Sequence, residues 1–173
     1  MRVLLDEVID TDYGQFDLVY SDEGGFDGVV ERFFDGQVNG LVGAADPHGV
    51  YLHFGRRSGG SSLRVVLVDA EPADDPRWED VVEVSTTVPP SGHVRWMSWA
   101  GESSGDLATL SPGDYRVRVS ARGRDAADRD ELRGEETDSY LVELWPAPWA
   151  PDSIIRTTTA NAARWHETWG GRR

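Results

Sequence analysis

Carboxylates are the most abundant chemically active side chains in this sequence, and many of them gather in two segments, 69–80 and 125–138. Strands on either side would hold both segments out to solvent as acidic loops. Together they could form a negative surface that imitates a phosphate backbone or complements a basic protein, although each loop alone could simply be solvated. The candidate partner-binding residues are Glu71, Asp74, Asp75, Glu79, Asp80, Asp125, Asp128, Asp130, Glu131, Glu135 and Glu136.

Tryptophan is the second notable residue type, with seven in 173 residues. Indole rings can line a binding face for sugars or small ligands. The candidate ligand face consists of Trp96, Trp99, Trp145 and Trp149, with Trp165 and Trp169 further along the chain. In the alternative interpretation, the same rings pack a C-terminal helix and the 146–151 segment onto the rest of the fold.

The sequence predicts no catalytic, cofactor or metal site. Ser103-Ser104-Gly105 and Ser58-Gly59-Gly60-Ser61 are interpreted as loop tips rather than as sites of a nucleophile, and the absence of cysteine removes thiolate chemistry and thiolate metal ligands. The histidines are widely spaced, and no calcium-loop pattern of aspartates is present. An enzyme remains an alternative only if carboxylates converge in a cleft on His53 or His93.

The charge balance narrows the class of partner. Acidic residues number 31 and basic residues 17, all of them arginine, which gives a formal net charge of -14. Such a charge repels nucleic-acid phosphates and anionic membranes, so we expect a basic protein partner or, alternatively, solubility alone. With no signal peptide and no apolar run of membrane-spanning length, a cytoplasmic protein without cofactors is expected.

Alternating apolar and polar residues predict strands along most of the chain. The clearest is 115–120, where Tyr115, Val117 and Val119 alternate with arginines and a serine, as in a half-buried strand. Further strands are expected at 13–21, 37–44, 50–55, 63–69, 78–88, 93–99 and 139–145, with a flexible turn at 58–62.

Two helices and one charged loop complete the expected elements. Apolar spacing predicts a short helix near 26–34, and a threonine at 157–159 is expected to cap a helix from about Ala160 to Trp169. The segment 122–138 is expected to be a charged loop. We therefore predict one mainly β domain over 1–173, an antiparallel β-sandwich of jelly-roll-like or barrel-like form, with the tail 146–173 packed on it.

Several local patterns resemble the competence protein J family, known as inhibitors of the DNA-entry nuclease. The patterns are Tyr13-Gly14-Gln15-Phe16, Val88-Pro89, Gly113-Asp114-Tyr115 and Asp138-Ser139-Tyr140-Leu141-Val142. The resemblance covers about residues 13–144, and a charged insertion at 122–136 and a tail from 145 depart from it. It implies a small β-sandwich that regulates by binding. The whole chain is also similar to acidic, arginine-rich bacterial proteins without assigned activity.

These observations lead to a non-enzymatic, acidic binding or regulatory protein as the first functional hypothesis, an inhibitor of a basic partner such as a nuclease or toxin. A small-ligand or carbohydrate-binding module that uses the tryptophan face is the alternative. A structural or assembly subunit is a further one, and the oligomeric state is left open.

Overall fold

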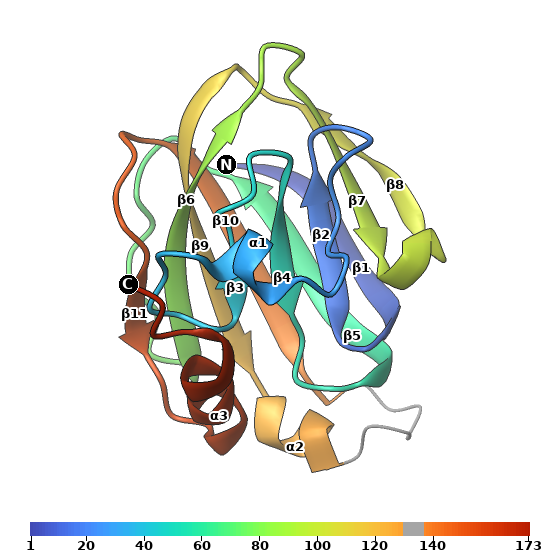
Figure 1. The fold of residues 1–173 in the computed structure, drawn as a ribbon, viewed down its shortest axis with the longest axis vertical. Helices are drawn as coiled ribbons and strands as arrows, with labels where there is room; N and C mark the ends of the chain where they lie inside the picture. The colour runs from blue at the N-terminus through green and yellow to red at the C-terminus, as the bar shows by residue number, and fades with distance from the viewer. Residues whose placement is uncertain (130–136) are drawn as a thin grey trace.

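The protein is a sandwich of two β-sheets with helices at one end (Figure 1). The computed structural model describes residues 1–129 and 137–173. In this part of the chain, the larger sheet contains β1 (Arg2–Asp12), β5 (Ser58–Leu67), β10 (Ser139–Pro146), β9 (Gly113–Arg122), β6 (Asp80–Val88) and β11 (Ser153–Arg156), in that order. The smaller sheet contains β3 (Val42–Gly43), β4 (Gly49–His53), β2 (Gln15–Val19), β7 (His93–Ser98) and β8 (Ser104–Thr109).

The predicted mainly β sandwich is confirmed, with one difference in strand direction. All neighbouring strands pair antiparallel except β5 and β10, which run parallel, with Leu63 opposite Tyr140. A parallel pair needs a crossover between its strands, and here β6 to β9 and α2 lie between them in sequence.

The core lies between the two sheets. Val65, Val117 and Val142 from the larger sheet and Leu18 and Val50 from the smaller sheet are all fully buried in one cluster. Burying each such side chain contributes about 1.5–3 kcal/mol, so the two inner faces hold the sheets together and fix the loops between them.

Two helices, α2 (Arg124–Arg129) and α3 (Ala160–Trp169), lie at one end of the sandwich, and α1 (Val30–Phe34) lies beside β3 of the smaller sheet (Figure 1). There is also a short 3-10 turn, η1 (Trp99–Gly101). The predicted C-terminal helix is confirmed, and Thr159 is its cap because its side chain accepts a hydrogen bond from the Ala162 N–H. The helix expected over 26–34 occupies only its second half.

Several predicted boundaries were wrong. The expected flexible turn at 58–62 is the beginning of β5, where Ser58 to Ser62 pair with the end of β1. The first strand, β1, was not predicted because acidic residues interrupt its apolar pattern on the exposed face. Of the strand expected over 37–44, only Val42–Gly43 pairs. The expected loop at 122–138 contains α2, and its residues 130–136 lie outside the described part of the chain.

The strand β9 is buried on both faces, not half-buried as its alternation predicted. Arg116 and Arg118 form ion pairs with Glu83 of the neighbouring β6, at 2.8 Å and 2.5 Å. The tail after β10 covers Arg116, which donates to the carbonyls of Ala150 and Pro151, and the segment before β6 covers Arg118, which donates to the carbonyl of Pro72. A charged side chain can be buried when it is paired with an opposite charge. The pairs with Glu83 therefore allow Arg116 and Arg118 to lie beneath other segments of the chain.

A candidate aromatic pocket at the helical end of the sandwich

The two acidic segments do meet in the structure, at the beginning of α3. Asp80 accepts hydrogen bonds from the backbone N–H groups of Thr158 and Thr159 at 2.9 and 3.1 Å, and from the Thr159 hydroxyl at 2.6 Å. Asp125 accepts from the N–H groups of Ala160 and Asn161. Carboxylates at a helix N-terminus satisfy its free N–H groups and its dipole. These two acids therefore position the helix.

Asp80 is only 1% exposed, whereas its predicted role in partner binding needs an accessible carboxylate. The other described candidates lie nearer the surface and already have internal partners. Glu71 pairs with Arg118, Asp74 with Arg156, Asp75 with Arg77 and Asp128 with Arg164, while Glu79 accepts from the Gly123 N–H. Asp130, Glu131, Glu135 and Glu136 lie outside the described residues.

The four tryptophans of the predicted ligand face do not share a face. Trp145 is 4% exposed under Arg118, and Trp96 packs on the core against Phe16. Trp149 is 63% exposed on the tail beside β6, and Trp99 belongs to η1. These four side chains therefore do not form one surface in the structure, because they come from β7, η1, β10 and the tail after β10.

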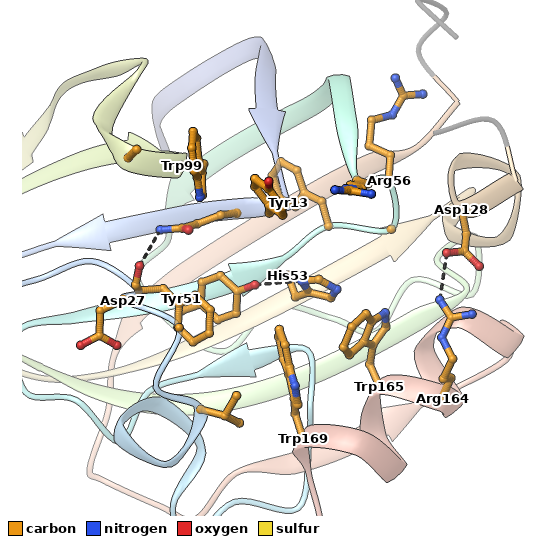
Figure 2. A pocket seen from close by; sticks show the side chains of 18 residues that line it. Tyr13, Asp27, Tyr51, His53, Arg56, Trp99, Asp128, Arg164, Trp165 and Trp169 are labelled. Carbon is orange, nitrogen blue, oxygen red and sulfur yellow. Dashed lines mark hydrogen bonds and ion pairs between the residues drawn. The ribbon is translucent and has the colours of Figure 1, made fainter. Parts of the chain in front are cut away.

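A different set of aromatic residues does converge. A cavity of about 790 Å³ opens at the helical end of the sandwich, between the turn after β1, the end of β4, η1 and the inner face of α3. Figure 2 shows Trp165 and Trp169 of α3 on one side of it and Tyr13 and Trp99 on the other. Its volume is in the range of small-molecule sites.

Two residues on the outer wall of the cavity have φ angles that are unusual for residues other than glycine. Tyr13 and Ala100 have φ angles of 56° and 51°, and they are the non-glycine residues with left-handed φ in the described chain. Both line the cavity, and the rings of Tyr13 and Trp99 lie 5.1 Å apart. Gly14 makes this turn possible, because a Cβ there would lie 2.9 Å from the Arg56 carbonyl oxygen. Left-handed non-glycine residues often mark functional sites.

The floor of the cavity is a packed group of rings. Tyr51 and His53 of β4 hydrogen-bond to each other at 2.8 Å (Figure 2). The His53 ring lies 4.1 Å from Trp165 and 4.8 Å from Trp169, and Phe26 stacks on Tyr51 at 4.1 Å. Because α3 supplies both tryptophans, the acids that hold its first turn also determine the shape of this cavity.

His53 is not arranged for catalysis. Burial, together with the positive charges of Arg124 and Arg164, holds its pKa well below the usual range, so the ring is neutral. Burial raises the pKa of its partner Tyr51 well above the usual range. The two carboxylates that line the cavity, Asp27 and Asp128, are paired with Arg32 and Arg164. A nucleophile beside a base, which acyl transfer requires, is not present among the described lining residues.

Arginines supply the charge around this cavity. The guanidinium of Arg57 lies over the Tyr13 ring at 5.1 Å and is exposed to solvent, and no carboxylate in the described ranges pairs with it. Beneath Gly55, Arg124 is 1% exposed and is held by neutral acceptors: the Asn161 side chain and the His53 carbonyl. Two guanidinium groups thus lack a carboxylate partner in a protein whose net charge is -14.

Within residues 1–129 and 137–173, no group of three or more histidines and carboxylates is placed to hold a metal ion. His48 contacts Ser21 and Glu23, and His93 contacts Asp106. No helix of this part of the chain has the length and apolar character needed to cross a membrane.

Fold and cavity together define a β-sandwich with a preformed aromatic pocket. The solved structure of ComJ, the inhibitor of the DNA-degrading activity of NucA from Bacillus subtilis, is similar, with a TM-score of 0.58 and 17% identity over 84% of this chain and 98% of that one. A protein described as crocagin biosynthetic gene J gives a TM-score of 0.55 and 14% identity over 83% and 96%. No family model and no curated protein matches the sequence.

The expected resemblance to the competence protein J family is thereby confirmed as a likeness of fold. The cavity itself was not predicted, since its residues come from six separate segments of the chain. One signal was present: Trp165 and Trp169 are four residues apart and therefore share one face of a helix. The sequence contained no comparable signal for Tyr13, Tyr51 or Arg57.

Proposed function

We propose that this protein is a non-enzymatic binding protein that holds a nuclease inactive. The likeness of fold to a nuclease inhibitor, which covers nearly all of that inhibitor, carries the proposal. The neutral, ring-enclosed His53 and the paired carboxylates of the cavity support a binding role over a catalytic one. Net charge favours a basic partner, since opposite charges accelerate and orient association.

A pull-down followed by an enzyme assay tests this function. The purified protein serves as bait in lysate of its source cells, and each basic protein that elutes as salt rises is then purified and tested for DNA degradation. We expect an equimolar amount of this protein to suppress the nuclease activity, and the affinity to fall between about 50 and 300 mM salt as exposed charges are screened. Affinity that is independent of salt, or DNA degradation that continues in the complex, would contradict the proposal.

A matched pair of variants locates the contact. Glu71 and Glu79 remain exposed beside β6 at one edge of the larger sheet, whereas Glu7 and Asp10 lie on β1 at the opposite edge. If the acidic segments face the partner, Glu71→Gln with Glu79→Gln weakens binding, and Glu7→Gln with Asp10→Asn does not. Equal losses in both double variants would mean that only the net charge matters.

A second candidate function is the binding of a small ligand in the aromatic cavity. The observation that favours it is the convergence of Tyr13, Trp99, Trp165 and Trp169 on a preformed space of about 790 Å³. A ligand there would change the fluorescence of the tryptophans. A broad panel of glycans and metabolites that leaves the emission of the protein unchanged would count against this function.

A further inference from the structure

The chemistry of the cavity specifies a ligand class within this second candidate function, on which the inference rests. Its apolar surface consists mostly of flat rings, and Tyr13 and Trp99 lie together on the outer wall beside left-handed backbone at Tyr13 and Ala100. Flat rings present faces on which another planar ring, such as a nucleobase, can stack favourably. Aliphatic ligands would gain no comparable contact.

The charge at the cavity is positive, opposite in sign to the rest of the protein. Arg164 is neutralised by Asp128 at 2.8 Å, and Asp27 by Arg32 at 2.9 Å. This leaves Arg57 on the wall and Arg124 beneath the floor as cations without a carboxylate partner in the described chain. Burial, with the charges of Arg124 and Arg164, also lowers the pKa of His53 at the floor, so this ring is neutral.

The two guanidinium groups differ in how they are satisfied. Arg124 is fully buried and is satisfied by three hydrogen bonds to neutral oxygens, so its charge still acts on whatever enters above it. Arg57 is different, because its guanidinium remains accessible and lies on the ring of Tyr13. An anionic group attached to a ring stacked at Tyr13 would therefore contact the Arg57 guanidinium.

We propose that the cavity binds a planar aromatic ring that carries an anionic group, with the ring among the tryptophans and Tyr13 and the anion paired with Arg57. Carboxylate and phosphate are both suitable anions, because the guanidinium fork matches the geometry of either. An aryl carboxylate and a mononucleotide therefore represent the two sources of this ligand chemistry.

Calorimetric titration with two pairs of probes tests the inference. The first pair is naphthalene-2-acetate and its neutral amide, and the second is adenosine 5′-monophosphate and adenosine. In each pair the ring is the same and the charge differs. We expect at least one of the two anions to bind about tenfold or more tightly than its neutral partner. The pair that shows the difference identifies the preferred anion.

Two variants test separately where the anionic group and the planar ring of the ligand bind. Arg57→Gln should weaken the anion about tenfold or more and leave the neutral partner unchanged. Tyr13→Asn should weaken both members of the pair, because asparagine tolerates the left-handed backbone but offers no ring. Arg64→Gln, which removes an exposed charge from β5 away from the cavity, is the matched control and should change neither.

The outcomes distinguish a failure of this inference from a failure of the second candidate function, on which it rests. Equal binding of anion and neutral partner, unaffected by Arg57→Gln, overturns the anionic ligand class and leaves the cavity as a small-ligand site. Binding that is unaffected by both Arg57→Gln and Tyr13→Asn places the ligand elsewhere and overturns the inference. No binding of any of the four probes at millimolar concentration overturns the inference, and together with the silent fluorescence panel it also removes the second candidate function.

Discussion

At the scale of single residues, Asp17 has the most unusual environment in the protein. Its carboxylate is 1% exposed and accepts hydrogen bonds from the Gln15 side chain at 2.6 Å and the Phe26 N–H at 3.0 Å. Burial outweighs these bonds and raises its pKa to about 7. Gln15 and Phe26 both line the aromatic cavity, so the protonation of Asp17 acts directly behind its wall.

This raised pKa predicts a pH dependence of stability. In the unfolded chain Asp17 loses its proton near pH 4, whereas in the folded chain it keeps the proton to about pH 7. The stabilisation is therefore complete below pH 4, is lost as pH rises to 7, and stays lost above. Relative to Asp17→Asn, the free energy of unfolding of the wild type should fall by about 1 kcal/mol for each pH unit between 5 and 7.

Denaturant unfolding at pH 5, 6, 7 and 8 measures this difference. The exposed substitution Asp10→Asn provides the control, since its carboxylate lies on the open face of β1. Curves for the wild type and Asp17→Asn that run parallel across this range would show that Asp17 is ionised in the folded protein, contrary to the prediction.

At the scale of elements, α3 depends on one buried acid for its position. The Asp80 carboxylate accepts three hydrogen bonds from Thr158 and Thr159, and α3 in turn supplies Trp165 and Trp169 to the cavity. Asp80→Ala leaves those donors without an acceptor in a buried position. We expect it to lower the free energy of unfolding by about 2–3 kcal/mol and to weaken ligand binding in the cavity.

Asp74→Ala is the matched control, because Asp74 lies in the same segment and forms a half-exposed ion pair with Arg156. It should cost less than about 1 kcal/mol. Chemical denaturation monitored by tryptophan fluorescence reports both effects. An Asp80→Ala protein as stable as Asp74→Ala, with unchanged emission, would mean that α3 is held by its apolar face alone.

The strand pair β6 and β9 depends on a second buried acid. Glu83 is about 10% exposed and pairs with both Arg116 and Arg118 under the tail of the chain. Glu83→Gln leaves two buried guanidinium groups with no carboxylate between them. We expect a loss of about 3 kcal/mol in the free energy of unfolding. Asp6→Asn, which breaks the exposed pair with Arg64 at 3.8 Å, should cost less than about 1 kcal/mol, and equal costs would contradict the argument.

These elements also show how far the sequence could be interpreted. Alternation and helical spacing located the sandwich, the β9 strand and α3, because local periodicity reflects which face is buried. It could not show that the tail would cover Arg116 or that the segment before β6 would cover Arg118, since that burial depends on contacts across more than 30 residues. The cavity depends on the same kind of distant contact. Its one local signal was the spacing of Trp165 and Trp169.

At the scale of the whole molecule, the negative charge is distributed very unevenly. Most arginines of the described chain are paired with acids or stacked on rings, and many acids of the two predicted binding segments are bound to the protein itself. The chain nevertheless has a net charge of -14, whereas Arg57 at the cavity has no carboxylate partner in the described residues. Such an arrangement suits a basic partner over the outer surface and a small anion within the cavity.

The same imbalance predicts how salt affects stability. With a net charge of -14 at pH 7, repulsion among like charges destabilises the compact state more than the expanded one. The buried pairs around Glu83 and Asp80 are little affected by salt, whereas surface repulsion is screened over about 8–10 Å. The thermal midpoint at pH 7.5 should therefore rise as sodium chloride increases from 10 to 300 mM. Near pH 4.5, where the sequence pI lies, the same addition should have little effect. A midpoint that falls with salt at pH 7.5 would mean that attractive surface pairs outweigh the excess of negative charge.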